Sequence, residues 1–507
     1  MSRTQNTRLI CPLTEATPNA MRDAMTRAVA AGATAVEYRL DFLSKHPDDE
    51  TLALLLADVP VETIVTYRPT RQGGHYEGGE DVRLRTLGRA SELGATFIDV
   101  EDDVPLADRP EGSTILSYHN FDTVPDDVAS RAASIGASRP AINKLACHAE
   151  HPADAMRMLD LIDATDQPTI ALAMGEAGVL TRLLAHKCGA AGTFATLASE
   201  SASAPGQPAL SDMTGLYRFD RASSNAEIYG VVGCPVGHSM SPAIHNTAFD
   251  ACDYDAIYLP LLVEPGEESF NRLMDAMVAR PELAFHGLSV TIPHKENALA
   301  WVGADRCDEL SAKIGAINTI SLSADGSIRG TNTDYAAAID ALCDAMGIQR
   351  ADLENYRTTV IGAGGEARAI VAALNHYGCV PTIYNRTLSR AEAIADQFGG
   401  TALPLDAVES LEADIVINCT PIGMYPHVDA SPLETIPDDV QVVFDTIYNP
   451  LETQLIAKAK QRGLLTVSGI DMFVNQAVAQ FELWTQRPAP RDVMRQVVLE
   501  KLGQTHA

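Results

Sequence analysis

The sequence has 507 residues, of which 46% are hydrophobic and 21% charged, a composition typical of folded globular domains rather than of a disordered chain. A chain of this length exceeds what one hydrophobic core supports, so two or more domains are expected. The 67 acidic residues against 38 basic ones give a net charge of −29, which argues against nucleic acid and anionic membranes as partners.

The N-terminus and the cysteines indicate the compartment. Residues 1–8 lead almost directly into a predicted strand at Leu9–Leu13, which leaves no room for a signal or transit peptide. No apolar run is long enough to cross a bilayer. The nine cysteines are scattered, odd in number and without a C-x-x-C pair, as is typical of reduced thiols. We therefore expect a cytoplasmic protein.

From residue 8 to about residue 215, short apolar runs alternate with amphipathic segments. Predicted helices such as Asn19–Ala31 and Pro152–Asp163 separate the strands. Eight strand–helix repeats in about 200 residues predict a (β/α)8 barrel at the compact end of its size range. The eight predicted strands are Leu9–Leu13, Thr34–Arg39, Glu62–Tyr67, Thr96–Glu101, Thr114–His119, Ala141–Cys147, Thr169–Met174 and Ala191–Leu197.

Polar residues occupy several of these strands' ends, where barrels of this kind place their reactive groups. Lys144 interrupts an otherwise apolar strand, and a buried ammonium is costly unless it is paired or loses its proton. A neutral lysine in a pocket can attack a carbonyl carbon and form a Schiff base. A lysine whose ammonium reaches solvent or a carboxylate is the structural alternative. The polar strand-end residues are Glu37, Arg39, Arg68, Glu101, His119 and Lys144.

His119 and the arginines extend this candidate site. The ordinary pKa of histidine lies near neutrality, so His119 is a candidate general acid and base. Arg39, Arg68 and Arg182 could together hold a carboxylated polyol, with bidentate geometry at the carboxylate. Structural salt bridges are the alternative for each arginine.

The ordered set of motifs in this half resembles type I 3-dehydroquinate dehydratase over residues 8–215. The resemblance implies that Lys144 forms an iminium with the C3 ketone of the substrate, while His119 removes the C2 proton and returns one to the departing C1 hydroxyl. It also implies that Arg182 binds the carboxylate, that Glu37, Arg39 and Arg68 bind hydroxyls, and that Ser203 and Gln207 close a lid. The motifs are Glu37-Tyr38-Arg39, Thr66-Tyr67-Arg68, Gly73-Gly74, Ser117-Tyr118-His119, Lys144, Thr181-Arg182 and Ser203-Ala204-Pro205-Gly206-Gln207.

One position departs from the family pattern. The family usually carries a glutamate directly before the Gly-Gly pair, where it supports the catalytic histidine, and this chain carries Gln72. A glutamine can orient the ring by a hydrogen bond but supplies no charge to stabilise an imidazolium. We therefore expect an active but slower dehydratase.

A glycine-rich stretch marks a nucleotide site in the second half. A predicted strand at residues 359–361 leads into Gly362-Ala363-Gly364-Gly365-Glu366-Ala367-Arg368 and a helix, which places a pyrophosphate against helix N–H groups. About twenty residues further on, Asn385-Arg386-Thr387 stands where NAD enzymes carry an acid. Because Arg386 suits a 2′-phosphate, we predict NADP as the cofactor.

Lys295 and Asp334 are a candidate proton-transfer pair, with a structural ion pair as the alternative. They belong to motifs that resemble shikimate dehydrogenase from Glu227 to the C-terminus. The resemblance implies that Ser239, Ser241 and Tyr448 bind a carboxylate, that Thr291, Asn318, Asp334 and Gln476 bind ring hydroxyls, and that Lys295 and Asp334 move the proton. The predicted cofactor-binding residues are Gly362, Ala363, Gly364, Gly365, Arg368, Asn385, Arg386, Thr387, Thr420, Gly469 and Met472, and no metal is implied.

Together the two resemblances predict a bifunctional enzyme of the shikimate pathway. The expected domains are a barrel at 1–219, a substrate-binding domain at 226–335, a Rossmann NADP-binding domain at 336–469, and C-terminal helices at 470–507 that complete the substrate domain. The alternatives are a quinate/shikimate dehydrogenase with a weakened dehydratase, a class I aldolase barrel, a structural barrel, and a non-catalytic quinate-pathway sensor. We expect the second half to cover the barrel face that serves dimerisation, and therefore expect a monomer.

Overall fold

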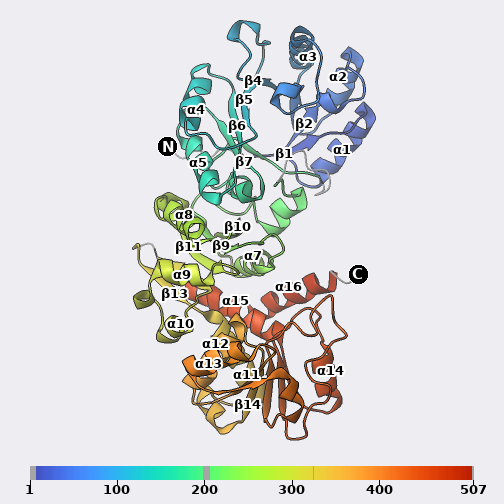
Figure 1. Cartoon of the computed structure of the whole chain (residues 1–507). Coiled ribbons are helices and arrows are strands. Elements are labelled where there is room, and N and C mark those ends of the chain that lie inside the picture. Colours follow the sequence, from blue (N-terminus) through green and yellow to red (C-terminus); the bar gives the residue numbers. More distant parts are fainter. Residues whose placement is uncertain (1–6, 198–205, 324, 505–507) are drawn as a thin grey trace. The chain divides into compact units, whose positions relative to one another are not determined.

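The computed structural model describes residues 7–197, 206–323 and 325–504 (Figure 1). The chain divides into two compact units, residues 1–237 with 255–285 and residues 238–254 with 286–507. In the described part of the chain, no helix combines the length and the apolarity needed to span a bilayer.

The first unit begins with an eight-stranded parallel sheet in the order β7-β6-β5-β4-β3-β2-β1-β8. The N–H of Ala191, just before β8, donates to the carbonyl of Thr169 on β7 over 2.8 Å, so the two edges of the sheet meet and the barrel is nearly closed. The strands are β1 Arg8–Leu13, β2 Ala35–Arg39, β3 Glu62–Thr66, β4 Phe97–Glu101, β5 Thr114–Asn120, β6 Ile142–His148, β7 Thr169–Met174 and β8 Gly192–Phe194.

Apolar side chains from the strands fill the interior of the barrel. Ile10, Ile64, Ile115, Ile142 and Ile170 come from five different strands and belong to one buried cluster. This packed layer supports the polar groups at the carboxyl ends of the strands. The helices of the barrel are α1 Pro18–Ala30, α2 Asp49–Leu56, α3 Glu80–Glu92, α4 Val128–Ala137, α5 Pro152–Asp163 and α6 Val179–Leu183.

The barrel prediction is confirmed, and seven of the eight predicted strands agree with the structure within one residue at either end. The eighth is wrong at its carboxyl end, because Ala191–Leu197 was predicted and β8 covers only Gly192–Phe194. Ala195 still donates to the Ile10 carbonyl of β1 over 3.0 Å, but Thr196 pairs with Ala209 and leaves the barrel ladder.

The first unit also contains β9 Glu227–Gly233, β10 Ala256–Leu262 and α8 Glu267–Val278. The strands β9 and β10 run parallel and pair along their whole length. Two ion pairs join α8 and the residues that follow it to barrel helix α5: Arg272–Asp154 at 2.6 Å from within α8, and Arg280–Asp160 at 2.7 Å from just beyond its end.

The second unit is built on a six-stranded parallel sheet in the order β16-β15-β14-β17-β18-β19, the doubly wound order of a dinucleotide-binding domain. Its strands are β14 Thr358–Ile361, β15 Thr382–Asn385, β16 Thr401–Pro404, β17 Ile415–Asn418, β18 Val442–Asp445 and β19 Leu465–Ser468. Helices α11 Thr333–Met346, α12 Gly365–His376, α13 Leu388–Phe398, α14 Gln454–Gln461, α15 Gly469–Thr485 and α16 Arg491–Gln504 accompany it.

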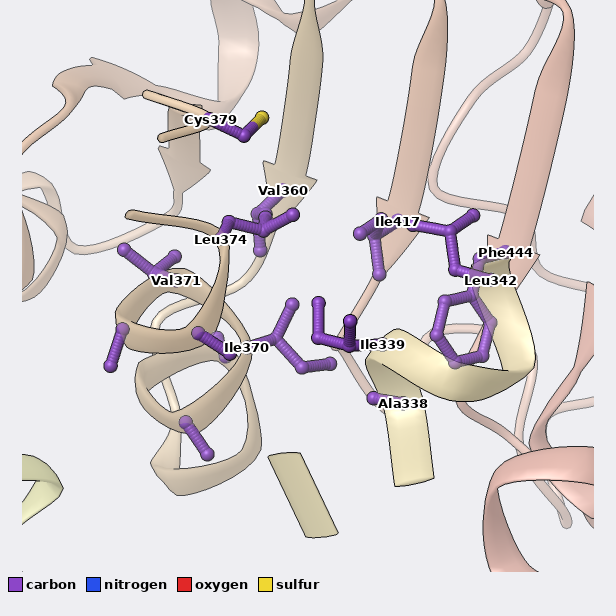
Figure 2. Close-up of a cluster of buried hydrophobic side chains, with 14 of the residues drawn as sticks. Ala338, Ile339, Leu342, Val360, Ile370, Val371, Leu374, Cys379, Ile417 and Phe444 are labelled. Atoms are coloured by element: carbon purple, nitrogen blue, oxygen red, sulfur yellow. The ribbon is translucent and has the colours of Figure 1, made fainter. Parts of the chain in front are cut away.

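Figure 2 shows the core of this domain, where side chains of α11 and α12 pack against the central strands. Ile339 of α11 and Ile370 of α12 lie together with Val360 of β14, and Ile417 of β17 and Phe444 of β18 complete the layer. This packing holds the first turn of α12 at the carboxyl end of β14, where the glycine-rich loop joins them. The remaining elements are α7 Ser241–Ala251, β11 Phe285–Val290, α9 Lys295–Val302, α10 Glu309–Ile314, β12 Thr319–Leu322 and β13 Ile328–Thr331, of which β11, β12 and β13 pair antiparallel.

Candidate active sites

Lys144 lies on β6 inside the barrel and is only 5% exposed. Its Nζ is 2.9 Å from Oδ2 of Asp99 on β4 and 3.6 Å from Oε1 of Glu37 on β2. It also lies 4.6 Å from the centroid of the Phe194 ring. The buried Lys144 side chain therefore lies against two carboxylates, and this pairing offsets the cost of its burial.

Asp99 is the centre of a buried network around this lysine. Arg68 Nη2 lies 2.9 Å from Asp99 Oδ1, and Ser117 Oγ donates to the same oxygen over 2.7 Å. Arg68 Nη1 also donates to Glu101 over 2.7 Å and to Ser117 over 2.9 Å. Burial alone would raise the pKa of Asp99, but the Arg68 and Lys144 cations hold it well below its usual range. Asp99 therefore stays ionised beside the lysine.

His119 lies on β5, the strand next to Lys144, and the register places Ser117 opposite Lys144. Its ring stacks on Phe121 with the centroids 6.0 Å apart, and its Nδ1 is buried with no hydrogen-bond partner among the described residues. Burial, together with the Arg68 and Lys144 cations, holds the pKa of His119 well below its ordinary value. A neutral imidazole at this position can accept a proton.

The two other arginines differ in their partners. Arg39 forms a bidentate pair with Asp41, at 2.9 and 2.8 Å. Arg182 is 1% exposed and donates to the Ala173 carbonyl oxygen over 2.5 Å. No carboxylate pairs with it in the described ranges, its Nε has no partner, and burial lowers its pKa to about 10. Among the described residues Arg182 is thus a buried cation without an anion, the arrangement that an anionic ligand would complete.

The other predicted positions of this half lie as follows. Glu37 accepts a hydrogen bond from Thr66 Oγ1 over 2.7 Å and faces Lys144. Gln72 Nε2 points to Asp103 Oδ2, 3.5 Å away, and no hydrogen bond joins it to His119 in the part of the chain that the structure describes. Gln207 lines a cavity of about 200 Å³ together with Glu176. Ser203 lies outside the described residues.

Lys295 and Asp334 form an ion pair of 2.6 Å at the first turns of α9 and α11. Asn318 Nδ2 donates to the other oxygen of Asp334 over 2.8 Å, and Asn332 caps the Asp334 N–H. Burial would lower the pKa of Lys295, but Asp334 raises it, so the lysine is charged and able to donate a proton. The predicted pair is therefore brought together in the structure.

A buried chain of side chains orients Asn318. Ser289 Oγ donates to Gln480 Oε1 over 2.8 Å, Gln480 Nε2 donates to Thr319 Oγ1 over 3.0 Å, and Thr319 Oγ1 donates to Asn318 Oδ1 over 2.8 Å. Because Oδ1 of Asn318 is occupied as an acceptor, its amide group faces Asp334. This series of hydrogen bonds thereby fixes the position of the Asp334 carboxylate, which contacts Lys295.

The glycine-rich loop leaves space for a phosphate group. Gly362 has a φ of +119°, and an added Cβ would lie 2.8 Å from the Cys419 carbonyl oxygen. At Gly364 and Gly365 an added Cβ would meet nothing within 4 Å, and α12 begins directly there. Backbone N–H groups at an open helix N-terminus bind pyrophosphate, so this loop fits a dinucleotide.

Two exposed arginines follow β15. The Asn385 amide donates to the Thr387 carbonyl over 2.8 Å and bends the chain between them. Arg386 and Arg390 are exposed and have no carboxylate partner in the described ranges, which suits a 2′-phosphate. Arg368 differs, because its guanidinium lies over the Phe398 ring at 5.9 Å.

The remaining predicted residues are placed as follows. Ser241 N–H donates to Ser239 Oγ over 3.2 Å, and Tyr448 stacks on Phe473 at 4.9 Å. Among the described residues, no hydrogen bond joins the side chains of Ser239, Ser241, Thr291, Tyr448 or Gln476 to Lys295 or Asp334. Gln476 donates to the Phe473 carbonyl, and Thr420 Oγ1 donates to Asn418 Oδ1. Of the other predicted cofactor residues, Ala363 is half-buried, Met472 is buried, and Gly469 is the first residue of α15.

Comparison with known proteins identifies the family. Residues 9–224 match the type I 3-dehydroquinase model, and residues 231–320 match the shikimate dehydrogenase substrate-binding domain. Residues 345–448 match the shikimate/quinate 5-dehydrogenase model, and 469–499 match the shikimate 5'-dehydrogenase C-terminal domain. The bifunctional 3-dehydroquinate dehydratase/shikimate dehydrogenase of Arabidopsis thaliana is 36% identical over 97% of this chain and 85% of its own length. The chain belongs to this bifunctional family.

Relatives with one function match the dehydrogenase half alone. Shikimate dehydrogenase (NADP(+)) of Methanosarcina acetivorans is 40% identical over 54% of this chain and 98% of its own length. A solved shikimate dehydrogenase in complex with NADP+ is 34% identical, covers 55% of this chain and 97% of its own, and gives a TM-score of 0.50. The order of a dehydratase barrel followed by a dehydrogenase is therefore confirmed.

Sequence reasoning missed several residues of the two halves. In the dehydratase half it missed Asp99, although the signal was present: Asp99 and Glu101 alternate on one face of an otherwise apolar strand. In the dehydrogenase half it missed Thr319 and Gln480, which are separated by about 160 residues in the chain and have no local pattern. Arg390 was also missed, four residues after Arg386.

Proposed function

We propose that the protein dehydrates 3-dehydroquinate to 3-dehydroshikimate in its barrel and reduces that product to shikimate with NADPH in its dehydrogenase half. The observation that carries the proposal is a chain of the bifunctional family with two separate reactive lysines, Lys144 against Asp99 and Lys295 against Asp334. The chain would then be a lyase and an oxidoreductase in the shikimate pathway, which supplies aromatic amino acid biosynthesis.

The dehydration uses the lysine as a nucleophile. Lys144, once deprotonated, attacks the C3 ketone and expels water to form an iminium. The ionised Asp99 at 2.9 Å stabilises this cation. The iminium withdraws electrons from C2, so the neutral His119 can remove a C2 proton and return a proton to the C1 hydroxyl as it leaves. Hydrolysis of the iminium releases 3-dehydroshikimate and restores the lysine.

Arg182 is the proposed partner of the substrate carboxylate, because it is a buried guanidinium with no anion among the described residues. Arg39 and Arg68 already pair with carboxylates, so we propose that they orient those groups and contact the substrate hydroxyls. Glu37 faces the same space beside Lys144. Ser203 and Gln207 are the proposed lid residues.

In the dehydrogenase half, bound NADPH supplies the hydride to the ketone carbon. Lys295 donates a proton to the ketone oxygen, and Asp334 orients and recharges the lysine. We propose Ser239, Ser241 and Tyr448 for the substrate carboxylate and Thr291, Asn318 and Gln476 for its hydroxyls. The proposed cofactor residues are Gly362, Ala363, Gly364, Gly365, Arg368, Asn385, Arg386, Thr387, Thr420, Gly469 and Met472.

The proposal includes the domain bounds 1–219, 226–335, 336–469 and 470–507, a monomeric state, and a cytoplasmic location without nucleic-acid or membrane partners. All nine cysteines lie in the described residues and are free thiols, which supports a reducing compartment. The net charge of −29 supports the absence of polyanionic partners.

The test is NADPH consumption by the purified protein supplied with 3-dehydroquinate alone. NADPH oxidation is expected, because the barrel produces the 3-dehydroshikimate that the dehydrogenase half reduces. Borohydride should trap a covalent substrate adduct, which the Lys144→Ala variant must lose and the matched Lys187→Ala variant must keep, since Lys187 bonds the Ser224 carbonyl elsewhere in the unit. Absence of both oxidation and adduct would contradict the proposal.

A further inference from the structure

Arg83 is a buried cation on a barrel helix that the proposed dehydration does not use. It lies on α3, and its side chain is 0% exposed. Its Nη1 lies 2.7 Å from Oε2 of Glu101, the last residue of β4, in an ion pair outside hydrogen-bond geometry. The same nitrogen donates to the Tyr67 carbonyl oxygen over 3.1 Å, directly before Arg68 in the chain. Arg83 therefore contacts both segments that carry Arg68 and Glu101.

The charges that lead from Arg83 to Lys144 alternate in sign. Glu101 Oε1 lies 2.7 Å from Arg68 Nη1, and Arg68 Nη2 lies 2.9 Å from Asp99 Oδ1. Asp99 Oδ2 lies 2.9 Å from Lys144 Nζ. All five side chains are at most 7% exposed. Without Arg83, Glu101 would have one cation for two buried carboxylate oxygens.

Glu80 continues this alternation to the protein surface. Its Oε1 lies 2.6 Å from Arg83 Nη2, its Oε2 accepts a hydrogen bond from Arg83 Nε over 2.9 Å, and its side chain is 43% exposed. Arg83 thus binds Glu80 with one edge of the guanidinium and reaches Glu101 with the remaining nitrogen. This two-sided geometry needs the planar fork of an arginine and fixes the guanidinium beside Glu101.

The charge of Glu101 decides how firmly Arg68 is held. An ionised Glu101 binds one Arg68 nitrogen while the other points to Asp99, whereas a protonated carboxyl attracts the cation far less. Burial raises the pKa of Glu101, Asp99 adds to the rise, and the Arg68 and Arg83 cations oppose it. Loss of Arg83 would leave Glu101 protonated up to a higher pH and remove one anchor of Arg68.

We propose that Arg83 is a positioning residue of the dehydration. Through Glu101 and the Tyr67 carbonyl, it holds Arg68 in the orientation that keeps the Asp99 carboxylate against Lys144. That carboxylate is the group that stabilises the iminium cation. The inference rests on the proposed Schiff-base dehydration and extends it to a residue of the helix layer.

The other titratable groups determine how the effect of Arg83 can be measured. Burial would lower the pKa of Arg68, but Asp99 and Glu101 raise it, and the pKa of Asp99 lies well below its usual range, so both keep their charge. Burial and nearby cations hold the pKa of His119 below its ordinary value, so His119 adds to any acidic limb. The informative quantity is therefore a difference between variants. The other charged groups of the site are Glu37 and Lys144.

The experiment is the pH profile of kcat for dehydration of 3-dehydroquinate by the full-length protein, from about pH 5.5 to about pH 9.5. In Arg83→Met the acidic limb should move to higher pH by at least about one unit, so that kcat on that limb falls about tenfold and recovers at the alkaline end. Arg83→Lys, which keeps a cation, should move the limb less. The matched control is Arg85→Met, which should leave the profile unchanged, because Arg85 is 69% exposed on the same helix and pairs with Asp81.

A second background tests whether the effect passes through Glu101. Glu101→Gln has no acid to titrate at this position, so adding Arg83→Met to it should not move the acidic limb any further. An effect of Arg83 that is independent of Glu101 would instead add to that of Glu101→Gln.

A kcat lowered by the same factor at every pH in Arg83→Met would make Arg83 merely structural and overturn the inference. An equal shift in Arg85→Met, or a limb that Arg83→Met still moves in the Glu101→Gln background, would also overturn it. If Arg83→Met does not fold, Arg83→Gln takes its place and must show the same shift. A wild type that neither dehydrates 3-dehydroquinate nor forms the borohydride adduct would overturn the proposed function as well. An active wild type whose limb Arg83→Met does not move would overturn only the role of Arg83.

Discussion

The His119 imidazole is positioned by its strand and by the Phe121 ring, and no hydrogen bond reaches its buried Nδ1 among the described residues. An imidazole that cycles through a protonated state gains from a carboxylate at that nitrogen, which stabilises the cation. Gln72 supplies none, because its amide faces Asp103 over 3.5 Å. His119 is therefore neutral and able to accept a proton, but it is a weak base.

We predict that Gln72→Glu increases dehydratase turnover by about fivefold. In the wild type, Asp103 accepts a hydrogen bond from the Gln72 amide. Asp103 would repel a carboxylate at position 72, so we expect the new side chain to turn toward the His119 imidazole. The pKa of His119 should rise from its depressed value, which moves the acidic limb of the kcat profile to higher pH. Initial rates of 3-dehydroshikimate formation across pH measure both effects.

The matched control is Gln72→Met, which has similar length and no charge and should not increase turnover. Reduction of 3-dehydroshikimate should be the same in all three proteins, since Gln72 lies in the barrel. An unchanged rate and an unchanged pH profile in Gln72→Glu would show that the glutamine is not what limits this barrel.

Arg182 gives a second prediction at this scale. As a buried cation without an anion in the described ranges, it costs stability in the free protein and gains a partner when a carboxylate binds. Arg182→Met should therefore raise the KM for 3-dehydroquinate at least about a hundredfold while leaving the thermal midpoint equal or higher. A lower midpoint with an unchanged KM would assign Arg182 a structural role instead.

At the scale of elements, helix α5 begins with an unusual cap. His151 Nδ1 accepts the Ala153 N–H over 3.1 Å, so the proton must be on Nε2, which donates to the Ser269 carbonyl of α8 over 3.0 Å. One neutral imidazole thus caps α5 and ties it to α8. Protonation would turn Nδ1 into a donor and remove the cap.

We predict that this cap makes the stability of the first unit sensitive to acid. Burial lowers the pKa of His151, so below about pH 6.5 the unfolded chain binds a proton that the folded chain does not, and stability falls as pH falls. His119 and His245 act with the same sign, so the informative quantity is a difference between variants. Between pH 7 and pH 5.5, the thermal midpoint of the His151→Asn variant should fall less than that of the wild type, because Asn caps helices without titrating. An equal loss in both proteins would exclude His151 as a source of the acid sensitivity.

Local sequence patterns predicted the helices and strands well and the buried hydrogen-bond networks poorly. The barrel strands could be predicted because each is a short apolar run between polar turns, and Pro152–Asp163 could be predicted because proline at the first helical position marks its start. The eighth strand was overextended because Ala195 and Thr196 are apolar or β-branched, whereas Thr196 actually pairs with Ala209 in the following segment. Strand propensity does not encode which partner a residue finds.

The candidate sites divide in the same way. Lys144 could be found because it interrupts an apolar run and His119 because it ends one, while Lys295 and Asp334 could be found because they stand in motifs that resemble shikimate dehydrogenase. Asp99 was missed although its alternation with Glu101 was visible, whereas Gln480 reaches Thr319 only through the packing of α15 near β12. Such long-range hydrogen bonds depend on the assembled fold, which a single sequence does not specify at residue level.

At the scale of the whole molecule, the surface and the sites have opposite charge requirements. The net charge of −29 repels the anionic substrates and cofactor that the two halves are proposed to bind. Local cations overcome this only at short range: Arg182 in the barrel, Lys295 in the second half, and Arg386 with Arg390 after β15. Arg182 is buried and Lys295 is partly buried, so these two act where the effective dielectric is low, whereas Arg386 and Arg390 are exposed.

The same imbalance makes the folded chain repel itself, and we predict that salt stabilises it. Screening shortens the Debye length from about 10 Å at 0.1 M to about 3 Å at 1 M, which weakens repulsion among spread surface carboxylates more than attraction within buried pairs such as Arg68–Asp99. The thermal midpoint should therefore rise with NaCl at pH 7.5. Near pH 5 the same salt series should have a smaller effect, because part of the carboxylates are protonated and the net charge is smaller. An equal rise at both pH values would mean that salt acts through preferential exclusion and not through charge. A midpoint that falls with salt would mean that exposed ion pairs such as Arg71–Asp103 outweigh the repulsion.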